Sequence, residues 1–254
     1  MRAMIIFRPP QIQETREFYQ TLAENDRYQE HIWGKSQRFN SEKSVTSVSI
    51  ERYFTQKISP FLQPTDKVID IGCGSGLFLP ILARRCRKLV GVDISPEFIQ
   101  DSRETIDRFE LRNTHVCLAK SEELPFAENE FDAILMVDAI HHIYHLAETI
   151  SEMKRVLKPG GKLMIFEPNI LNPALFLMCL LDRNEWGAIG LGRKSAYRNL
   201  FQPFFQIDAI EYNGLLIGPD SPLNLKIADF LNHPTYSKFW GWLNPKILIS
   251  MTNR

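Results

Sequence analysis

Apolar and polar positions follow different rhythms in successive parts of the chain. Residues 1–60 are mostly polar, and apolar side chains in 15–23 and 45–58 recur at mixed three- and four-residue spacing, which is typical of helices. From residue 67 onward, short apolar runs alternate with amphipathic stretches. The apolar runs predict strands at 68–71, 89–92, 115–118, 133–137 and 162–166. The amphipathic stretches predict helices at 77–87, 96–109 and 146–157.

Cap and turn residues support these boundaries. Ser95 before Pro96 is typical of a helix N-cap followed by proline at the first helical position. The residues Pro159, Gly160 and Gly161 end the last of these helices and lead into the fifth strand. Because strands and helices alternate, we expect an α/β, doubly wound fold with helices on both faces of a parallel sheet. Its one crevice would lie at the carboxyl ends of the central strands.

The alternation stops beyond residue 168. Residues 174–181 are apolar on all sides, which suits either a helix buried in the interior or an apolar substrate pocket. Residues 246–252 return to strand character and are expected to form an edge strand. We divide the chain into a helical N-terminal lid (1–60), a ligand-binding core (61–168), and a substrate cap with closing edge strands in the same domain (169–254).

Composition narrows the possible partners. The 254 residues include 30 basic and 30 acidic side chains, so the formal net charge is zero. A nucleic-acid-binding protein is expected to have a basic stripe or a high pI, so we expect a small or apolar substrate and no nucleic acid. The four cysteines form no ligand pair, and no apolar stretch suits a secretory signal or a membrane span. We expect a cytoplasmic protein without an integral membrane segment, while peripheral membrane contact stays open.

The turn after the first predicted strand carries the strongest functional signal. Asp70 lies inside the strand, and Gly72, Gly74 and Gly76 follow in G-x-G-x-G spacing. Glycines allow a ligand to approach the backbone closely, but a buried carboxylate beside them disfavours a pyrophosphate. Asp93 ends the second strand, where an acid can accept hydrogen bonds from both ribose hydroxyls. This combination favours S-adenosylmethionine, which has an adenosine, an ammonium group and a sulfonium centre but no phosphate.

Four segments in order then make the resemblance specific. They are residues 68–76, 91–95, 121–126 and 157–161. With them, the chain resembles a class I S-adenosylmethionine-dependent methyltransferase of the small-molecule group, from about residue 67 to residue 168. The resemblance implies a mostly parallel, seven-stranded, Rossmann-like sheet with S-adenosylmethionine as cofactor. It also implies cofactor contacts from Asp70, Gly72, Cys73, Gly74, Gly76, Asp93, Ile94, Ser121, Glu122, Asp138, Ala139, Tyr28 and Trp33.

Two parts of this implied contact set are open. Tyr28 and Trp33 would come from the lid as cation–π partners of the sulfonium, but aromatic residues at helical spacing are more often part of a core. Lys120 stands where the family usually has the aspartate that binds the adenine amino group, and lysine cannot accept a hydrogen bond. Adenine would then be held by the amide or hydroxyl of Ser121, by Glu122, or by packing from Ile94.

The resemblance also suggests a catalytic group. His141 and His142 follow the fourth strand and Glu167 ends the fifth, so they could remove a proton from the acceptor, with His142 and Glu167 meeting across the crevice. The alternative is that the histidines line the pocket or cap a helix. We expect no metal site, because adjacent histidines should point apart.

The function predicted from the sequence is therefore methyl transfer from S-adenosylmethionine to a small or lipid-like acceptor, at a hydroxyl oxygen. C-methylation of a quinone-like or polyketide acceptor is a close alternative. A non-catalytic protein that binds S-adenosylmethionine and a nicotinamide-dependent oxidoreductase are alternatives from other classes. The motifs of adenine-N6 methylation are absent. The sequence names neither the acceptor nor the oligomeric state.

Overall fold

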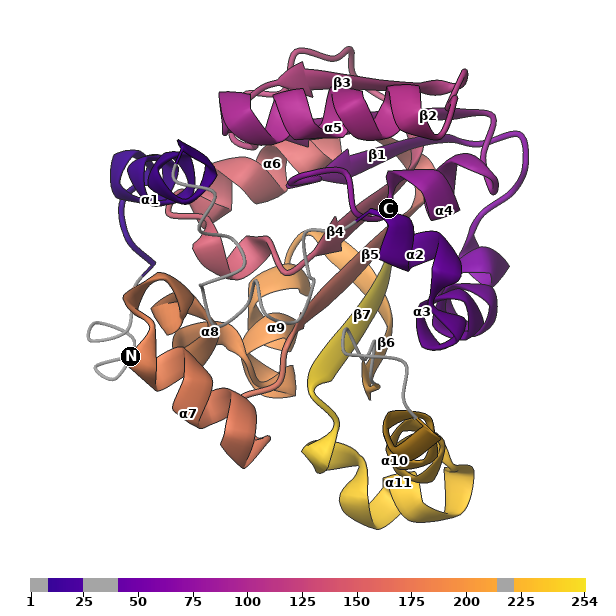
Figure 1. The fold of residues 1–254 in the computed structure, drawn as a ribbon, viewed down its shortest axis with the longest axis vertical. Coiled ribbons are helices and arrows are strands. Elements are labelled where there is room, and N and C mark those ends of the chain that lie inside the picture. Colours follow the sequence, from indigo (N-terminus) through magenta and orange to yellow (C-terminus); the bar gives the residue numbers. More distant parts are fainter. Residues whose placement is uncertain (1–8, 25–40, 214–221) are drawn as a thin grey trace.

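The computed structural model describes residues 9–24, 41–213 and 222–254 and has a single seven-stranded sheet at its centre (Figure 1). The strand order is β3-β2-β1-β4-β5-β7-β6, in which β1 to β5 are parallel and β7 runs antiparallel to both β5 and β6. The strands are β1 (Lys67–Ile71), β2 (Lys88–Asp93), β3 (Thr114–Leu118), β4 (Phe131–Val137), β5 (Leu157–Pro168), β6 (Phe205–Tyr212) and β7 (Lys246–Asn253). The doubly wound, mostly parallel α/β fold expected from the sequence is confirmed.

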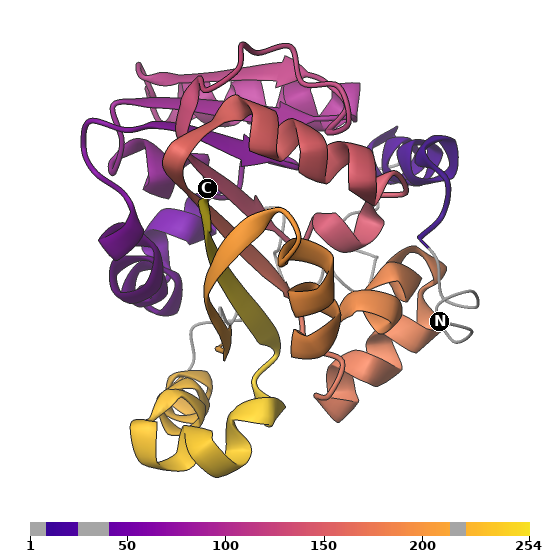
Figure 2. The same cartoon turned by 180° about the vertical axis from the view of Figure 1, so that it is seen from behind.

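Helices cover both faces of this sheet (Figures 1 and 2). One face is covered by α2 (Glu42–Thr46), α3 (Val48–Tyr53), the π-helical turn η4 (Phe54–Ile58), η5 (Ser59–Phe61), α4 (Leu79–Ala83) and α5 (Pro96–Arg108). The other face is covered by α6 (Leu146–Val156) and α9 (Lys194–Phe201). The remaining helices are α1 (Ile12–Glu24), η6 (Ile140–His142), α7 (Pro173–Leu181), η7 (Arg183–Glu185), α8 (Trp186–Leu191), α10 (Pro222–Asn232), α11 (Pro234–Trp240) and η8 (Gly241–Leu243).

The central strands are apolar because both of their faces are covered. In β1, Val68 packs with the α3–α5 side while Ile69 packs with the α6 side, and both are fully buried. Ile69 pairs with Val90 of β2 and with Ile134 of β4, so β1 lies between these two strands. Continuous apolar runs are the pattern expected for parallel strands buried on both faces.

Part of the expected N-terminal lid belongs to the core. Ile50, Phe54 and Ile58 are fully buried and pack in the same cluster as Val68 and Leu82. The apolar spacing of 45–58 was read correctly as helical, but these side chains bury against the sheet rather than standing apart from it. The lid predicted for residues 1–60 stays a prediction, and within it Ile50, Phe54 and Ile58 pack against the sheet.

The C-terminal strands also differ from expectation. β7 lies inside the sheet, between β5 and β6, and the edge is formed by β6, which the sequence analysis missed. β6 alternates apolar and polar residues and is only partly buried, so its pattern is weaker than that of the central strands. The helix expected at 77–87 is limited to α4, because residues 72–78 continue the glycine turn.

The apolar helix α7 is not buried in the interior. Of its side chains Cys179 is buried, whereas Leu177 is 55% and Leu181 is 74% exposed. Asn172 caps its N-terminus by accepting a hydrogen bond from the amide of Leu175 at 3.1 Å. None of the helices in the described ranges has the length and apolar character needed to cross a membrane.

Candidate functional site

The glycine turn after β1 is held against β2 by backbone hydrogen bonds. The amides of Gly72 and Cys73 both donate to the carbonyl of Val92, at 2.8 and 3.0 Å. Two buried hydroxyls of α5 fix the far side of the turn: Ser102 donates to the carbonyl of Gly74 at 2.7 Å and Thr105 to that of Ser75 at 3.1 Å. Sequence analysis missed this support, although two hydroxyl residues three apart on an amphipathic helix were a visible signal.

Two glycines of the turn, Gly72 and Gly74, have different surroundings. Gly74 has a positive φ of 54°, and a Cβ there would meet no atom within 4 Å. A Cβ on Gly72, in contrast, would come within 2.6 Å of the Cβ of Ala139. Gly74 is therefore the point at which a ligand can approach this backbone, and Gly72 is the point at which the turn packs against the end of β4.

Asp93 is oriented by the turn that it faces. Its carboxylate accepts the amide of Gly74 through Oδ2 and the amide of Ser95 through Oδ1, both at 2.9 Å. Burial raises the pKa of Asp93, and these amide hydrogen bonds oppose the rise. Since each carboxylate oxygen can accept more than one hydrogen bond, both oxygens keep capacity for the two ribose hydroxyls.

Asp70 supplies a second buried carboxylate beside the turn. Burial, together with the neighbouring Asp93 carboxylate, raises the pKa of Asp70 to about 7. A cation at this point would favour the ionised form of Asp70, and the ammonium group of S-adenosylmethionine is such a cation. The side chain of Cys73 is buried, and a Cβ on Gly91 would come within 2.9 Å of its sulfur.

The end of β4 brings Asp138 and Ala139 to the same place. Ala139 lies over Gly72, as described above, while Asp138 has a positive φ of 51° and forms a buried ion pair with Lys246 at the start of β7. The amide of Asp138 donates to the carbonyl of Phe166 at 2.8 Å. The structure thus joins the ends of β1, β2 and β4, as the resemblance implied.

The segment after β3 lies beside the end of β2, because the amide of Ala119 donates to the carbonyl of Asp93 at 3.0 Å. The hydroxyl of Ser121 lies 3.0 Å from that of Thr149 on α6 and 3.4 Å from Glu122. Lys120 is exposed, and Ile94 is partly buried next to Asp93. Tyr28 and Trp33, the expected aromatic contacts, lie outside the described residues.

A second group of side chains forms around Glu167. Its Oε1 accepts the amides of Ala139 and Ile140, both at 3.0 Å, and its Oε2 accepts Nδ1 of His141. The hydroxyl of Tyr197 donates to Oε2 at 3.4 Å. His141, rather than the expected His142, is the partner of Glu167, and both side chains are fully buried.

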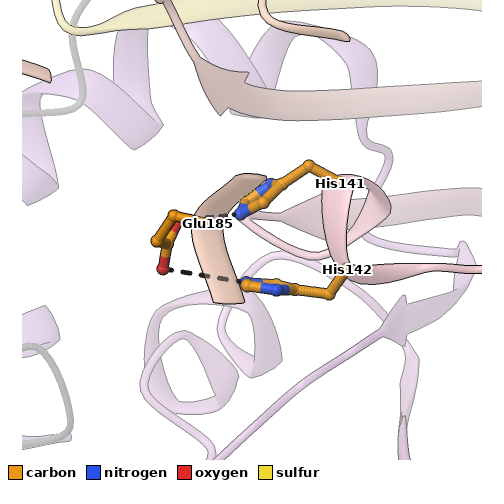
Figure 3. Close-up of side chains that lie close together, drawn as sticks. All are labelled: His141, His142 and Glu185. Atoms are coloured by element: carbon orange, nitrogen blue, oxygen red, sulfur yellow. Dashed lines mark hydrogen bonds and ion pairs between the residues drawn. The ribbon is translucent and has the colours of Figure 1, made fainter. Parts of the chain in front are cut away.

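Glu185 completes this group and was missed by the sequence analysis. Its Oε2 lies 3.1 Å from Nε2 of His141, and its Oε1 lies 3.9 Å from Nε2 of His142. Figure 3 shows both imidazoles directed at this carboxylate. The expectation that the two histidines point apart is wrong, because the short helical turn η6 brings their ring centroids to 4.0 Å.

Two buried carboxylates control the protonation of His141. Burial by itself lowers the pKa of His141, but Glu167 and Glu185 outweigh that effect and hold the pKa well above its ordinary value. Glu167 and His141 are thereby fixed in position, and the side chain of His142 has the most exposed surface, 12% against 4% for Glu185. If a side chain of this group contacts an acceptor directly, it is therefore His142.

The part of the chain that forms this site also matches known proteins. Residues 69–165 match the family model described as "Methyltransferase domain". The chain is 34% identical over 102 residues to the demethylmenaquinone methyltransferase of Tropheryma whipplei (strain Twist), covering 40% of this chain and 41% of the relative. It is 33% identical over 110 residues to the ubiquinone/menaquinone biosynthesis C-methyltransferase UbiE of Cupriavidus necator, covering 42% and 44%. The chain therefore spans less than half the length of the curated relatives that it matches.

The fold extends the similarity further than the sequence does. A crystal structure of a SAM-dependent methyltransferase from Aquifex aeolicus superposes with a TM-score of 0.58 and 15% sequence identity. The superposition covers 84% of this chain and 97% of that structure. At this identity the likeness supports the Rossmann-like methyltransferase fold, and the site residues must be argued from their own geometry.

Proposed function

We propose that this chain, in which residues 69–165 match a methyltransferase-domain family model, uses S-adenosylmethionine to methylate a ring carbon of a quinol-like acceptor. The observation that supports S-adenosylmethionine as the methyl donor is the open space at Gly74, beside the carboxylates of Asp70 and Asp93. Asp93 would bind the ribose hydroxyls and Asp70 the ammonium group. When bound, S-adenosylmethionine supplies an electrophilic methyl group on sulfur.

We assign carbon rather than oxygen as the methylated atom. The sequence analysis favoured a hydroxyl oxygen, but relatives that match residues of the core are named as menaquinone and ubiquinone C-methyltransferases. In C-methylation, the ring carbon bonds to the methyl carbon as the sulfur–methyl bond breaks, and the ring later loses the proton of that carbon. The quinol hydroxyl next to that carbon must lose or share its proton to make the ring nucleophilic.

The group around Glu167 is proposed to serve the acceptor side. His142 is its partly exposed member, while His141 and Glu167 hold the turn that carries Asp138 and Ala139. Proximity and orientation would supply most of the rate, with proton removal from the acceptor assigned to this group. His142→Ala and Glu167→Gln should lower turnover while S-adenosylmethionine binding is kept. If both variants retain full turnover, this group has no part in proton removal.

A lipid-like acceptor is supported by the surface next to this group. Helix α7 leads directly into η7, which carries Glu185, and exposes Phe176, Leu177, Leu180 and Leu181. Contiguous exposed apolar side chains of this kind mark binding sites for apolar partners. We propose that the prenyl-like tail of the acceptor, and with it a lipid surface, is met on this side.

Two matched acceptors test the reaction. The first is a naphthoquinol with one unsubstituted ring carbon beside a hydroxyl, and the second is the same quinol with that carbon already methylated. The full chain with S-adenosylmethionine should release S-adenosylhomocysteine with the first and not with the second. Turnover with both would indicate O-methylation and overturn the assignment to carbon.

The donor is tested separately by calorimetry with S-adenosylmethionine and with NAD. We expect binding of S-adenosylmethionine and none of NAD, and Asp93→Asn should weaken donor binding at least about tenfold, as the loss of a charge-assisted hydrogen bond costs about 1.5–3 kcal/mol. Donor binding without turnover on a panel of quinols, phenols and polyketides would show a binding protein and would contradict the proposed enzyme.

A further inference from the structure

The imidazoles of His141 and His142 both face the carboxylate of Glu185 (Figure 3). One ligand atom from each residue lies within 4.8 Å of the other two. Nε2 of His141 is 3.1 Å from Oε2 of Glu185, and Nε2 of His142 is 3.9 Å from the other carboxylate oxygen, Oε1. Around a tetrahedral Zn²⁺ with bonds of about 2.0–2.2 Å, ligand atoms are about 3.3–3.5 Å apart. The spacing of these donors is therefore close to that of a coordination sphere.

The hydrogen bond between His141 and Glu167 determines which ring nitrogen of His141 faces Glu185. A carboxylate can only accept a hydrogen bond, so the contact with Glu167 requires the proton on Nδ1 of His141. A neutral ring then presents the lone pair of Nε2 to Oε2 of Glu185, 3.1 Å away. Two lone pairs repel at that distance, so a proton, held by the ring or by the carboxyl group, or a metal ion must lie between them.

A metal ion can join more of these donor atoms than one proton can. A proton on Nε2 of His141 serves one ring, whereas Nε2 of His142 is 3.9 Å from Glu185 and beyond hydrogen-bond distance of it. A divalent ion would take both rings in their neutral form.

Glu167 holds His141 in the way that a carboxylate commonly holds a histidine metal ligand. Glu167 holds His141 through Nδ1 and is itself fixed by the amides of Ala139 and Ile140. Histidine ligands commonly donate their second nitrogen to a carboxylate in this way, which fixes the ring and its tautomer.

We propose that His141, His142 and Glu185 bind a divalent transition-metal ion, with Zn²⁺ the best match to two imidazole nitrogens and one carboxylate oxygen. Three protein donors leave the fourth position open to an oxygen. The ion would also tie η7, which carries Glu185, to the turn after β4. As a deepening that rests on the proposed function, the oxygen in the fourth position would be the acceptor hydroxyl.

Metal binding can be measured on the full chain without any methyl acceptor. After removal of metal by chelation, calorimetry with ZnCl₂ should show about one ion bound per chain, with a rise in Tm of about 5 °C or more at a hundredfold excess over Kd. Co²⁺ should give the absorption spectrum of a four-coordinate site. His142→Ala and Glu185→Gln should each weaken Zn²⁺ binding by more than about a hundredfold, and Glu167→Gln by about 10- to 100-fold.

His145→Ala is the matched control, since His145 is exposed and lies three residues beyond His142 on the same segment. It should bind Zn²⁺ as the wild type does. Circular dichroism checks that each variant is folded, and Glu185→Gln remains informative if His142→Ala does not fold. No binding to the wild type, or equal binding to all variants, would overturn the site.

The two proposals fail in different ways. Loss of Zn²⁺ binding in His142→Ala is read without S-adenosylmethionine or acceptor, so a positive result stands even if no quinol is methylated. Conversely, a wild type that methylates the matched quinol but binds no Zn²⁺ would retain the proposed function and overturn the metal site.

Discussion

Ala139 occupies the space that a side chain on Gly72 would need: a Cβ on Gly72 would lie 2.6 Å from the Cβ of Ala139. The contact joins the turn after β1 to the end of β4, two segments 67 residues apart in the sequence. It explains why the first glycine of the turn is needed for packing, whereas the second is open toward a ligand.

Gly72→Ala should destabilise the protein by about 2–5 kcal/mol. A positive φ costs a residue with a Cβ about 1–2 kcal/mol, and overpacking adds about 1–3 kcal/mol. Urea unfolding measures the loss. The double variant Gly72→Ala/Ala139→Gly should recover the overpacking part and keep the φ cost. If the double variant is no more stable than the single one, the two residues do not oppose each other as described.

Asp70 should make donor binding depend on pH. Its pKa of about 7 means that the ionised fraction of Asp70 increases as the pH rises from about 5.5 to 7.5. The ionised form is the one that attracts an ammonium group. The affinity for S-adenosylmethionine should rise over this range, by at most about tenfold per pH unit, and Asp70→Asn should flatten the dependence. Calorimetry at several pH values measures this, and an equal slope in both proteins would exclude Asp70 as its source.

The same group should affect stability in the opposite direction. Because the folded pKa of Asp70 lies above its unfolded value of 3.8, the folded state without ligand holds the proton more tightly. Its contribution is therefore fully present below about pH 4 and is lost as the pH rises through about 7. The free energy of unfolding of wild type relative to Asp70→Asn should fall across that window, and a rise instead would contradict the assigned environment.

Lys246→Met should be costly because it removes the ammonium group that pairs with the buried carboxylate of Asp138. Breaking a buried ion pair from one side costs about 3–5 kcal/mol. The double variant Asp138→Asn/Lys246→Met should lose less, since no charge is left buried and asparagine tolerates the positive φ at this position. Denaturant unfolding of both variants tests this. If both lose the same free energy of unfolding, the effect does not come from a buried charge.

Lys120→Asp should tighten binding of S-adenosylmethionine. The aspartate would accept a hydrogen bond from the adenine amino group, a contact that lysine cannot make. One such bond is worth about 1.5–3 kcal/mol, or roughly 10- to 150-fold in affinity. Calorimetry measures the change, and Lys120→Ala serves as the control for loss of the lysine alone. Unchanged affinity in Lys120→Asp would mean that adenine is held elsewhere.

Much of the donor site could be predicted from the sequence because its parts are local. Asp70 and the glycines lie on one continuous segment, and Asp93 ends the next strand, so strand alternation alone brings them to one edge of the sheet. The G-x-G-x-G spacing and the buried carboxylate of Asp70 also predict that this turn does not bind a pyrophosphate. The support from Ser102 and Thr105 was readable in principle, because it follows from the face that α5 buries.

The acceptor side was less predictable. The partner of the histidines, Glu185, lies 44 residues beyond His141 in a three-residue helical turn, and no periodic pattern marks it. Helix α7 gives the reverse case, since an all-apolar stretch predicts burial but does not say whether a neighbour covers it.

By itself, the sequence determined the alternating strands and helices, the glycine turn and the two acids at the strand ends, because hydrophobic period and backbone conformation are local properties. Only the tertiary structure decided that His141 pairs with Glu167 and Glu185, that β7 lies inside the sheet, and that residues 48–58 belong to the core. Each of these depends on which distant segments share a buried volume. A buried charge is stable only next to a partner of opposite charge, and that partner can come from any part of the chain.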